Sequence, residues 1–378
     1  MASPTRPMRV CHVIHGLAPG GAEQLLVELA IAGPSAGLDV TVVSLMPLTG
    51  RRYASELLSL GVTVESLNLP SRWDPRGMVR AERVIKRLRP QVIHTHLKHA
   101  DLVGAYAARR LGVPMVSTLH RIEDAETGVG RLKRWLGGQA RMRVAARTIT
   151  VSAAQRAWYL SAFRADPQKV VTIHNGVRSP AELTAPDRAR LRHELGLEPT
   201  DIAATMLGVM RPGKGHEQLI GAARLIPEDS PLRFVAVGDG PLRDSLERSA
   251  QEAGVAGTRV LFPGWRSDVS DILASSELVV HPTLFDALPT ALIYGLASGI
   301  PAVASDVGGV PEIVTPDTGI LVPAGDVPAL ASAVVELAGD PDRRAAAGLA
   351  ARRRFEEEFA AEVWVGRLRE LYEDVIKE

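Results

Sequence analysis

Short apolar runs rich in β-branched residues alternate along the chain with longer segments of helical periodicity. This order is typical of parallel sheets covered by helices on both faces. Because 378 residues suit two domains of ordinary size, we expect two Rossmann-like α/β domains in tandem. The predicted strands of the first are Val10–His15, Val40–Leu45, Val62–Leu67, Val92–Thr95, Met115–Leu119, Thr148–Ser152 and Val170–Ile173, and those of the second are Ala203–Leu207, Phe234–Val237, Val260–Phe262, Leu278–Val280 and Ala302–Ser305.

The segment Ser179–Glu198 is the best candidate for a linker between these domains, because prolines and charged residues are frequent in it. The first domain is therefore expected to be residues 1–178, and the second, which begins with this segment, residues 179–360. Helical periodicity predicts the helices Glu23–Ala32, Arg76–Arg89, Leu242–Ala253 and Leu330–Ala338, with Arg343–Phe359 and Ala361–Ile376 closing the chain.

Composition excludes several classes of protein. With 46% hydrophobic and 23% charged residues, the chain is neither intrinsically disordered nor fibrous. Its single cysteine, Cys11, lies in an apolar run and is expected to be buried, and a cytoplasmic location is the default. The N-terminus does not resemble a signal peptide. The longest uncharged stretch, Ala287–Ser305, contains prolines and glycines, which fit a buried helix and strand better than a membrane span.

Charge is distributed unevenly between the two halves. Residues 1–178 contain 25 Lys and Arg against 12 Asp and Glu, whereas residues 179–378 contain 19 against 31. The basic half therefore suits an anionic partner. A basic run, Arg131–Leu136 continuing to Arg141, Arg143 and Arg147, is either a solvated helix face or a contact with a phosphorylated acceptor or an anionic membrane, which would place the protein peripherally on the inner face. No nucleic-acid partner is expected, because no binding module is present.

Glycine-rich turns follow predicted strands in both halves. Gly20 and Gly21 follow the first strand, and Gly208–Gly215, which contains Arg211 and Lys214, follows the first strand of the second half. Backbone N–H groups in such turns can approach a phosphate, and a neighbouring arginine and lysine supply the matching charge. Each turn alone is also compatible with a tight turn that binds nothing. Similar turns, Gly238–Pro241 and Gly308–Glu312, lie at strand ends, where open α/β sheets bind ligands.

The order of these motifs resembles that of the family-4 glycosyltransferases, which have the GT-B fold. The similarity covers nearly the whole chain, through Gly20–Glu23, Ile93–His96, Ser117–His120, Val151-Ser152, Ile173–Val177, Arg211–Gly215, Gly238–Pro241 and His281–Val314. It implies two Rossmann-like domains facing each other across a cleft, with an acceptor held mostly by the first and a sugar nucleotide mostly by the second. It also implies that residues 361–378 form a helix crossing back to the first domain.

The resemblance further implies a retaining transfer of a hexose-type sugar from a nucleotide-diphosphate donor to a hydroxyl of a glycan, glycolipid or small molecule, with no metal or other cofactor. The leaving diphosphate accumulates charge in such a reaction, and Arg211 and Lys214 would stabilise it. The donor's own phosphate would be the base, His120 would orient the sugar, and Asp286 would bind sugar hydroxyls. The other positions expected to contact the donor or acceptor are Gly20, Gly21, Gly238, Asp239, Ala287, Leu288, Pro289, Thr290, Tyr294 and Glu312.

Two positions depart from the family pattern. The paired glutamates of the family fall here on Asp286 and Tyr294. Asp286 can still accept hydrogen bonds, whereas a phenol cannot hold two ribose hydroxyls as a carboxylate does. Val209 stands where the family often has an arginine, and Arg211 is expected to substitute for it. Nucleotide binding is therefore expected to be reorganised or weakened.

Three histidines close in sequence, His94, His96 and His99, raise the question of a metal site. His94 and His96 would point to one face of a strand, but the sequence supplies no evident set of further ligands for zinc. We therefore expect no metal, and place His96 or Lys98 near the acceptor.

Two other functions remain open at this point. A sugar-nucleotide epimerase also uses two Rossmann-like domains, but it needs acid and base groups around the sugar, and the order of motifs argues against it. A partner subunit that has kept the fold and lost activity is suggested by Val209 and Tyr294.

Overall fold

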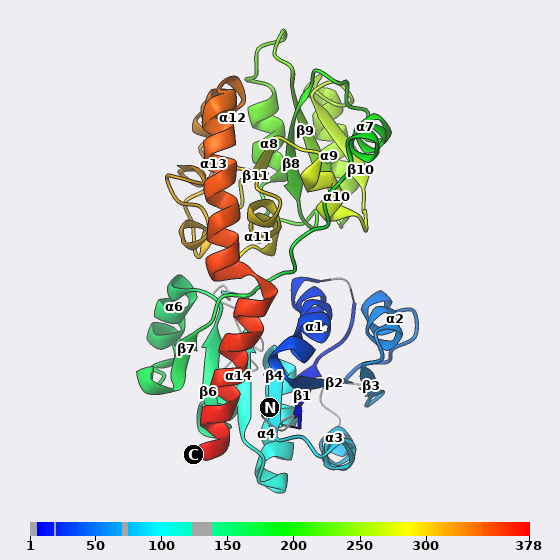
Figure 1. Cartoon of the computed structure of the whole chain (residues 1–378), viewed down its shortest axis with the longest axis vertical. Coiled ribbons are helices and arrows are strands. Elements are labelled where there is room, and N and C mark those ends of the chain that lie inside the picture. The colour runs from blue at the N-terminus through cyan, green and yellow to red at the C-terminus, as the bar shows by residue number, and fades with distance from the viewer. Residues whose placement is uncertain (1–5, 19, 70–74, 123–137) are drawn as a thin grey trace, which may run out of the picture. The chain divides into compact units, whose positions relative to one another are not determined.

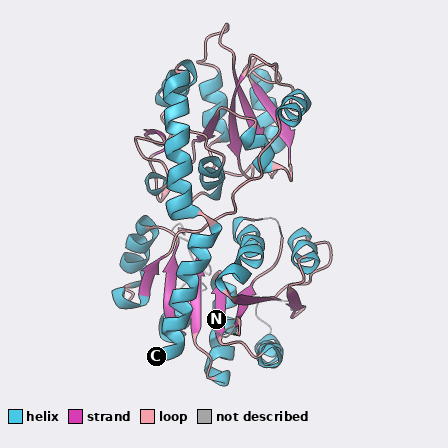
Figure 2. Cartoon of the chain, viewed as in Figure 1, coloured by secondary structure: helices cyan, strands magenta, loops and turns pink. Residues whose placement is uncertain are grey.

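The computed structural model describes residues 6–18, 20–69, 75–122 and 138–378. The chain divides into two compact units, unit 1 (Met1–Arg178 with Ala361–Glu378) and unit 2 (Ser179–Ala360). Each unit contains a parallel sheet, of seven strands in unit 1 and six in unit 2 (Figure 2). This confirms the predicted α/β class with two Rossmann-like domains.

The sheet of unit 1 has the strand order β3-β2-β1-β4-β5-β6-β7. Alternate residues of β1 point to opposite faces, so that Val10 and Ile14 pack into one core cluster and Cys11 and Val13 into another. The strands are β1 (Met8–Ile14), β2 (Leu38–Ser44), β3 (Thr63–Ser66), β4 (Val92–His96), β5 (Met115–Leu119), β6 (Ala145–Thr150) and β7 (Val170–Thr172), and the helices are α1 (Gly21–Ala32), α2 (Arg52–Ser59), α3 (Pro75–Leu88), α4 (Lys98–Leu111), α6 (Ala153–Phe163) and α14 (Ala361–Lys377), with 3-10 turns Gly33–Ala36 and Pro167–Lys169.

The C-terminal helix α14 belongs to unit 1 (Figure 1). Its first backbone N–H, that of Ala361, donates to the carbonyl of Val177 at 2.9 Å. Trp364, Leu368 and Tyr372 lie on one face at helical spacing and join the core cluster that contains α1. The chain therefore completes the core of unit 1 only with its last residues.

The sheet of unit 2 has the strand order β10-β9-β8-β11-β12-β13. Its last strand, β13, was not predicted; it begins with Gly319, a residue that is depleted in strands. The strands are β8 (Ile202–Leu207), β9 (Leu232–Val237), β10 (Val260–Gly264), β11 (Leu278–His281), β12 (Ala302–Ser305) and β13 (Gly319–Val322), and the helices are α7 (Ala185–Glu194), α8 (His216–Ala223), α9 (Arg243–Glu252), α10 (Val269–Ala274), α11 (Thr290–Ala297), α12 (Val327–Gly339) and α13 (Pro341–Arg354), with a 3-10 turn Val310–Glu312 and a π-helical turn Phe355–Phe359.

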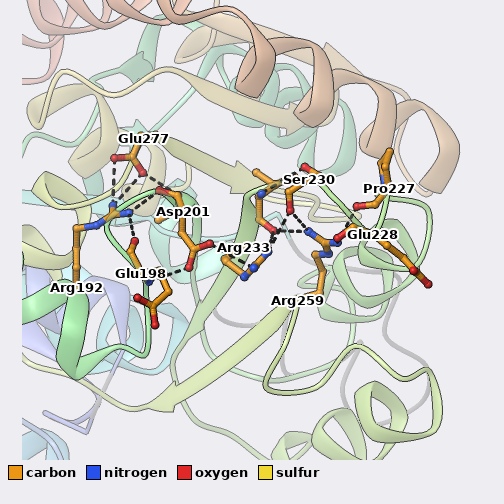
Figure 3. A network of polar contacts seen from close by, with 11 residues as sticks. Arg192, Glu198, Asp201, Pro227, Glu228, Ser230, Arg233, Arg259 and Glu277 are labelled. Atoms are coloured by element: carbon orange, nitrogen blue, oxygen red, sulfur yellow. Dashed lines mark hydrogen bonds and ion pairs between the residues drawn. The ribbon is translucent and has the colours of Figure 1, made fainter.

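The predicted linker Ser179–Glu198 is not an irregular segment throughout, because it contains α7. Pro186 lies in the first turn of this helix, where proline is tolerated, and the Thr184 side chain caps the helix by accepting from the N–H of Asp187. Arg192 of α7 donates to the carbonyls of Ser275 and Asp201 and to the carboxylate of Glu277 (Figure 3). The polar network in Figure 3 lies where β8, β9 and β11 begin and anchors α7 to that edge of the sheet.

The basic run Arg131–Leu136 lies outside the described residues. The prediction that it continues along one exposed face is wrong for Arg141, which is buried and paired with Asp101 at 2.5 Å. Asp101 also accepts from the hydroxyls of Thr95 and Ser117, so this ion pair holds α4 to the sheet. In the part of the chain that the structure describes, no helix is long and apolar enough to cross a membrane.

Candidate functional site

Three loops meet at the carboxyl edge of the unit 2 sheet, after the adjacent strands β8, β11 and β12. Gly213 and Gly215 have φ of +82° and +91°, and a Cβ on Gly215 would collide with the carbonyl of Pro282. The N–H of Leu284 donates to the carbonyl of Gly213 at 2.9 Å. Gly308, with φ of +53°, touches the backbone of Asp286 in the same way. Glycine is required at Gly215 and Gly308 because the loops pack backbone against backbone there, whereas a Cβ on Gly213 would meet the ring of Phe285.

This packing brings two predicted donor-site residues together. Lys214 Nζ lies 2.5 Å from Asp286 Oδ2, and both side chains are largely buried. His281, the last residue of β11, has Nε2 at 3.6 Å from the same oxygen. Burial opposes ionisation of Asp286, but His281 and the Lys214 ammonium outweigh it and hold the pKa of Asp286 well below its usual range. The unit therefore keeps a buried, ionised pair at the edge where parallel sheets bind ligands.

Gly238 and Gly240 hold the two neighbouring loops of this edge together. A Cβ on Gly238 would collide with the carbonyl of Gly208, and one on Gly240 with that of Met210. The exposed Asp239 accepts from the N–H of Gly240 at 2.7 Å, and its carbonyl accepts from Met210. These residues give the β8 loop its shape.

The remaining predicted donor residues lie on or near α11 and the turn after β12. Ala287 and Leu288 are buried just before α11, Pro289 is its N-cap and Thr290 its first residue. Tyr294, one turn further along α11, is half-buried. Glu312 is also half-buried, and its carbonyl accepts from Arg354. In the β8 loop, Val209 is 46% exposed and Arg211 is half-buried.

In unit 1, the predicted anion-binding turn begins α1. Gly20 is the N-cap of this helix, and Gly21 is its exposed first residue. The carboxyl group of Glu23 lies against Gly20, and burial raises the pKa of Glu23 to about 7. The turn therefore faces an acidic group with much reduced charge at neutral pH.

Four histidines gather at the carboxyl end of the neighbouring strands. His94 and His96 lie on β4, His12 on β1, and His120 directly follows β5. His12, His94 and His96 are at most 5% exposed, and His120 is half-buried. Burial lowers the pKa of His12 to about 3 and that of His120 to about 4, and it lowers those of His94 and His96 well below 6.5. All four rings are thus neutral at pH 7.

A small cavity of about 10 Å³ lies beside this group and is lined by residues of unit 1, among them His96, His120, Asn175 and Trp364. This leaves room for about one water molecule, so a sugar does not fit inside it.

Two residues of these sites were not singled out in the sequence, His12 and His281. His12 pairs with His94 in the register of β1 and β4, and His281 ends β11, 67 residues after Lys214 in the chain. The signal that would have found His12 is a polar side chain inside an otherwise apolar predicted strand, and for His281 it is a polar residue directly after one. His99, which was considered with His94 and His96, contacts His15 instead.

The ligand-capable nitrogens of His12, His94 and His96 lie within 4.8 Å of one another. However, both nitrogens of His94 and both of His96 already take part in hydrogen bonds. A metal bound by these rings would have to displace several of those bonds, so the arrangement favours a hydrogen-bonded cluster.

Comparison with known proteins defines the class of this fold and site. The family model of glycosyl transferases group 1 matches residues 187–354, and that of glycosyltransferase family 4 matches residues 19–179. Alpha-maltose-1-phosphate synthase of Mycolicibacterium smegmatis is 32% identical over 295 residues, which cover 71% of this chain and 75% of that protein. The chain belongs to the family-4 glycosyltransferases.

Two other similar proteins are consistent with this family assignment. The Escherichia coli UDP-Gal:alpha-D-GlcNAc-diphosphoundecaprenol alpha-1,3-galactosyltransferase is 28% identical over 276 residues, covering 71% of both chains. The structure of Anabaena Alr3699/HepE, solved with UDP and glucose, superposes with a TM-score of 0.85 at 22% identity, covering 97% of this chain and 100% of that one. This likeness supports the GT-B fold, and the protein is a nucleotide-sugar glycosyltransferase rather than an epimerase.

Proposed function

Within this family, we propose that the protein transfers a hexose from a UDP-hexose to an acceptor hydroxyl, with retention at the anomeric carbon and without a metal ion or other cofactor. The choice of UDP is supported by the name of the Escherichia coli relative and by the nucleotide bound to the Anabaena protein. The acceptor is a glycan, a glycolipid or a small molecule.

The observation that carries this proposal is the buried pair of Lys214 and Asp286 at the meeting point of three loops. Lys214 is the only lysine among residues 179–360. A diphosphate bound at this edge accepts from Lys214 and Arg211 and from the backbone N–H groups of Ala287, Leu288 and Thr290 at the start of α11. Asp286, held ionised by its surroundings, accepts from hydroxyls of the sugar.

The remaining residues have supporting roles in the proposal. Tyr294 and Glu312 lie beside the nucleoside, and Gly238, Asp239 and Gly240 shape the phosphate loop. In unit 1, Gly20 and Gly21 approach the acceptor, and His120 donates to an oxygen of the substrate. As the glycosidic bond breaks, charge grows on the diphosphate, and cations already in place stabilise it without reorganisation. The donor phosphate then accepts the proton of the acceptor hydroxyl.

The donor is tested first by thermal stabilisation with UDP, GDP and their sugars, because a ligand of the folded state alone raises stability by RT ln(1 + [L]/Kd). We expect a shift with UDP and a UDP-hexose that persists in EDTA. Proton NMR of the transferred product gives the anomeric configuration, which retention requires to match that of the donor. An inverted product, or loss of activity in EDTA, contradicts the proposed mechanism.

The diphosphate assignment is tested by Lys214→Gln, whose amide can still donate to Asp286. We expect the Kd for UDP to rise by about tenfold to a hundredfold, as befits a lost charge-assisted hydrogen bond, and kcat to fall. Lys169→Gln, at an exposed position in unit 1, is the control. If both variants bind UDP as the native protein does, Lys214 does not hold the diphosphate.

Contact with an anionic membrane is a second proposal, and it rests on the charge of the first 178 residues. We expect the protein to sediment with vesicles that contain anionic lipid and not with neutral ones, and salt to abolish this binding. Equal binding to both kinds of vesicle, or to neither, contradicts the proposal.

A further inference from the structure

Three histidines of unit 1, His12, His96 and His120, form a continuous hydrogen-bonded chain. Nδ1 of His12 lies 2.9 Å from Nε2 of His96, and Nδ1 of His96 lies 2.8 Å from Nε2 of His120. The chain starts at the fully buried His12 and ends at the half-buried His120. Each link joins two ring nitrogens, so in each link one nitrogen carries a proton and the other does not.

Because all three rings are neutral, each carries one proton on its two nitrogens. Only two arrangements then satisfy both links. In the first, the proton of each ring is on Nδ1: His12 donates to His96, and His96 donates to His120. In the second, every proton is on Nε2, and both bonds run in the opposite direction.

The unshared end of the chain decides between these two arrangements. Nε2 of His12 is fully buried and has no hydrogen-bond partner among the described residues. In the first arrangement this nitrogen is a bare acceptor, whereas in the second it is an N–H buried without an acceptor. Buried N–H groups without a partner are rarer in proteins than buried acceptors without one, and each costs about 1–3 kcal/mol. The first arrangement is therefore favoured, with the proton of His120 on Nδ1.

His94 lies beside the chain without interrupting it. Its Nδ1 bonds to the hydroxyl of Tyr372 at 2.5 Å and its Nε2 to the hydroxyl of Thr118 at 2.7 Å. Each hydroxyl can donate or accept, so His94 imposes no direction on the chain. Tyr372 of α14 is thus a useful control, because it touches the histidine cluster outside the three linked rings.

We propose that His12 and His96 are positioning residues that hold His120 in the tautomer with its proton on Nδ1, so that His120 donates a hydrogen bond to the substrate and does not accept a proton there. This inference rests on the proposed function, in which His120 contacts the substrate. Nε2 of His120 is occupied by His96, which leaves Nδ1 for a ligand. A protonated Nδ1 cannot act as a base at that atom, in keeping with a reaction whose base belongs to the donor.

The tautomer is read directly from the whole protein labelled with ¹⁵N-histidine, by two-bond ¹H–¹⁵N correlation NMR at pH 7.5, with His120→Asn used to assign the signals. We expect His120 and His96 to show a protonated Nδ1 and an unprotonated Nε2. A His120 protonated on Nε2 in the native protein would overturn the proposal, whatever the activity.

The positioning role is tested by a matched pair at residue 96. In His96→Leu, Nε2 of His120 loses its donor, and we expect its signals to show a mixture of tautomers. We also expect kcat to fall by about tenfold to a hundredfold, as for a displaced catalytic group, while KM for the UDP-hexose stays within about twofold. In His96→Gln, the amide N–H can donate to His120, and both the tautomer and most of kcat should return.

Tyr372→Phe separates positioning from general destabilisation. We expect it to lower Tm, because His94 loses its partner, and to leave the His120 signals and kcat unchanged. If Tyr372→Phe shifts them as much as His96→Leu does, the effect is structural and the proposal fails. If His96→Leu does not fold, His96→Gln and the native tautomer still decide the matter.

Two further outcomes are distinguishable. A stoichiometric metal in the purified protein, with altered His12, His94 and His96 signals, would replace the hydrogen-bonded chain by a metal site. If the native protein shows the expected tautomer of His120 but transfers no sugar from any nucleotide sugar, the proposed function is refuted. The proposed arrangement of the histidine chain is then still supported.

Discussion

At the scale of single residues, the sites of this glycosyltransferase depend on groups whose ionisation is set by burial and by neighbouring charges. His12 is neutral because it is fully buried, and burial also lowers the pKa of the half-buried His120 to about 4. Asp286 is ionised although it is buried, because His281 and Lys214 lie 3.6 Å and 2.5 Å from its Oδ2. If a linked histidine or Lys214 is removed, its hydrogen-bond partner is left unsatisfied in the interior. That loss costs more free energy than the contact contributes when it is present.

The buried histidines make the protein sensitive to mild acid. Histidine in the unfolded chain has a pKa near 6.5, whereas that of His12 is about 3 and that of His120 about 4 in the folded protein. Below pH 6.5 the unfolded state therefore binds more protons. The free energy of unfolding should fall by up to about 1.4 kcal/mol per pH unit for each such histidine. The raised pKa of Glu23 acts in the opposite direction for one group.

This effect is measured by Tm between pH 7.5 and pH 4.5, a window that lies above the pKa of 3.8 usual for Asp286 and so excludes its titration. We expect Tm to fall across the window. His12→Gln, which has one buried histidine fewer, should show a shallower fall. A Tm that is constant from pH 7.5 to pH 4.5 would contradict the neutral buried state of these rings.

At the scale of elements, the donor edge of unit 2 is built by close contacts between loop backbones. Gly215 combines a φ of +91° with a position directly against the carbonyl of Pro282. Gly257 has a comparable φ of +71° but faces open space. Substituting alanine at Gly257 therefore measures the free-energy cost of a left-handed backbone alone, and substituting it at Gly215 adds the cost of a collision.

We expect Gly257→Ala to lower stability by about 1–2 kcal/mol, the cost of a left-handed backbone for a residue with a Cβ, without affecting UDP binding. Gly215→Ala should cost a further 1–3 kcal/mol or so for overpacking, and it should weaken UDP binding because the loop that carries Lys214 must move. Calorimetric titration with UDP and thermal unfolding check both. Equal UDP affinity in the two variants would mean that this packing does not position Lys214.

At the scale of the whole molecule, the path of the chain links the two units, because unit 1 contains both ends of the sequence. The chain leaves unit 1 after Arg178, builds unit 2 and returns as α14. Trp364, Leu368 and Tyr372 then fill the core of unit 1. Unit 1 therefore reaches its final core only after unit 2 has been synthesised.

Deletion of residues 361–378 should consequently affect the two units differently. We expect residues 6–178 to lose most of their protection in hydrogen–deuterium exchange, while residues 179–360 keep theirs. Deletion of Lys377 and Glu378 alone removes two ion pairs near the surface, Arg147–Glu378 and Lys377–Asp374, and should have little effect. If the longer deletion leaves exchange in unit 1 unchanged, α14 is not part of its core.

The sequence predicted the elements with strong local signals. Buried parallel strands are apolar runs bounded by turns, and the predicted Val92–Thr95 and Phe234–Val237 fall within β4 and β9 for that reason. It failed where the local signal was ambiguous. Pro186 was taken as part of a linker although it lies in the first turn of α7, and β13 begins with a glycine, which is depleted in strands.

The sequence by itself determined the α/β class, the two-domain organisation, the glycine turns at strand ends and the family, since all of these depend on periodicity and on motifs that are local in the chain. Only the tertiary structure decided which side chains meet. Lys214 meets Asp286 across 72 residues, and His12 meets His96 across 84. Such contacts depend on strand order and register, which bring distant segments side by side, and register is fixed by packing of the whole sheet rather than by any one strand.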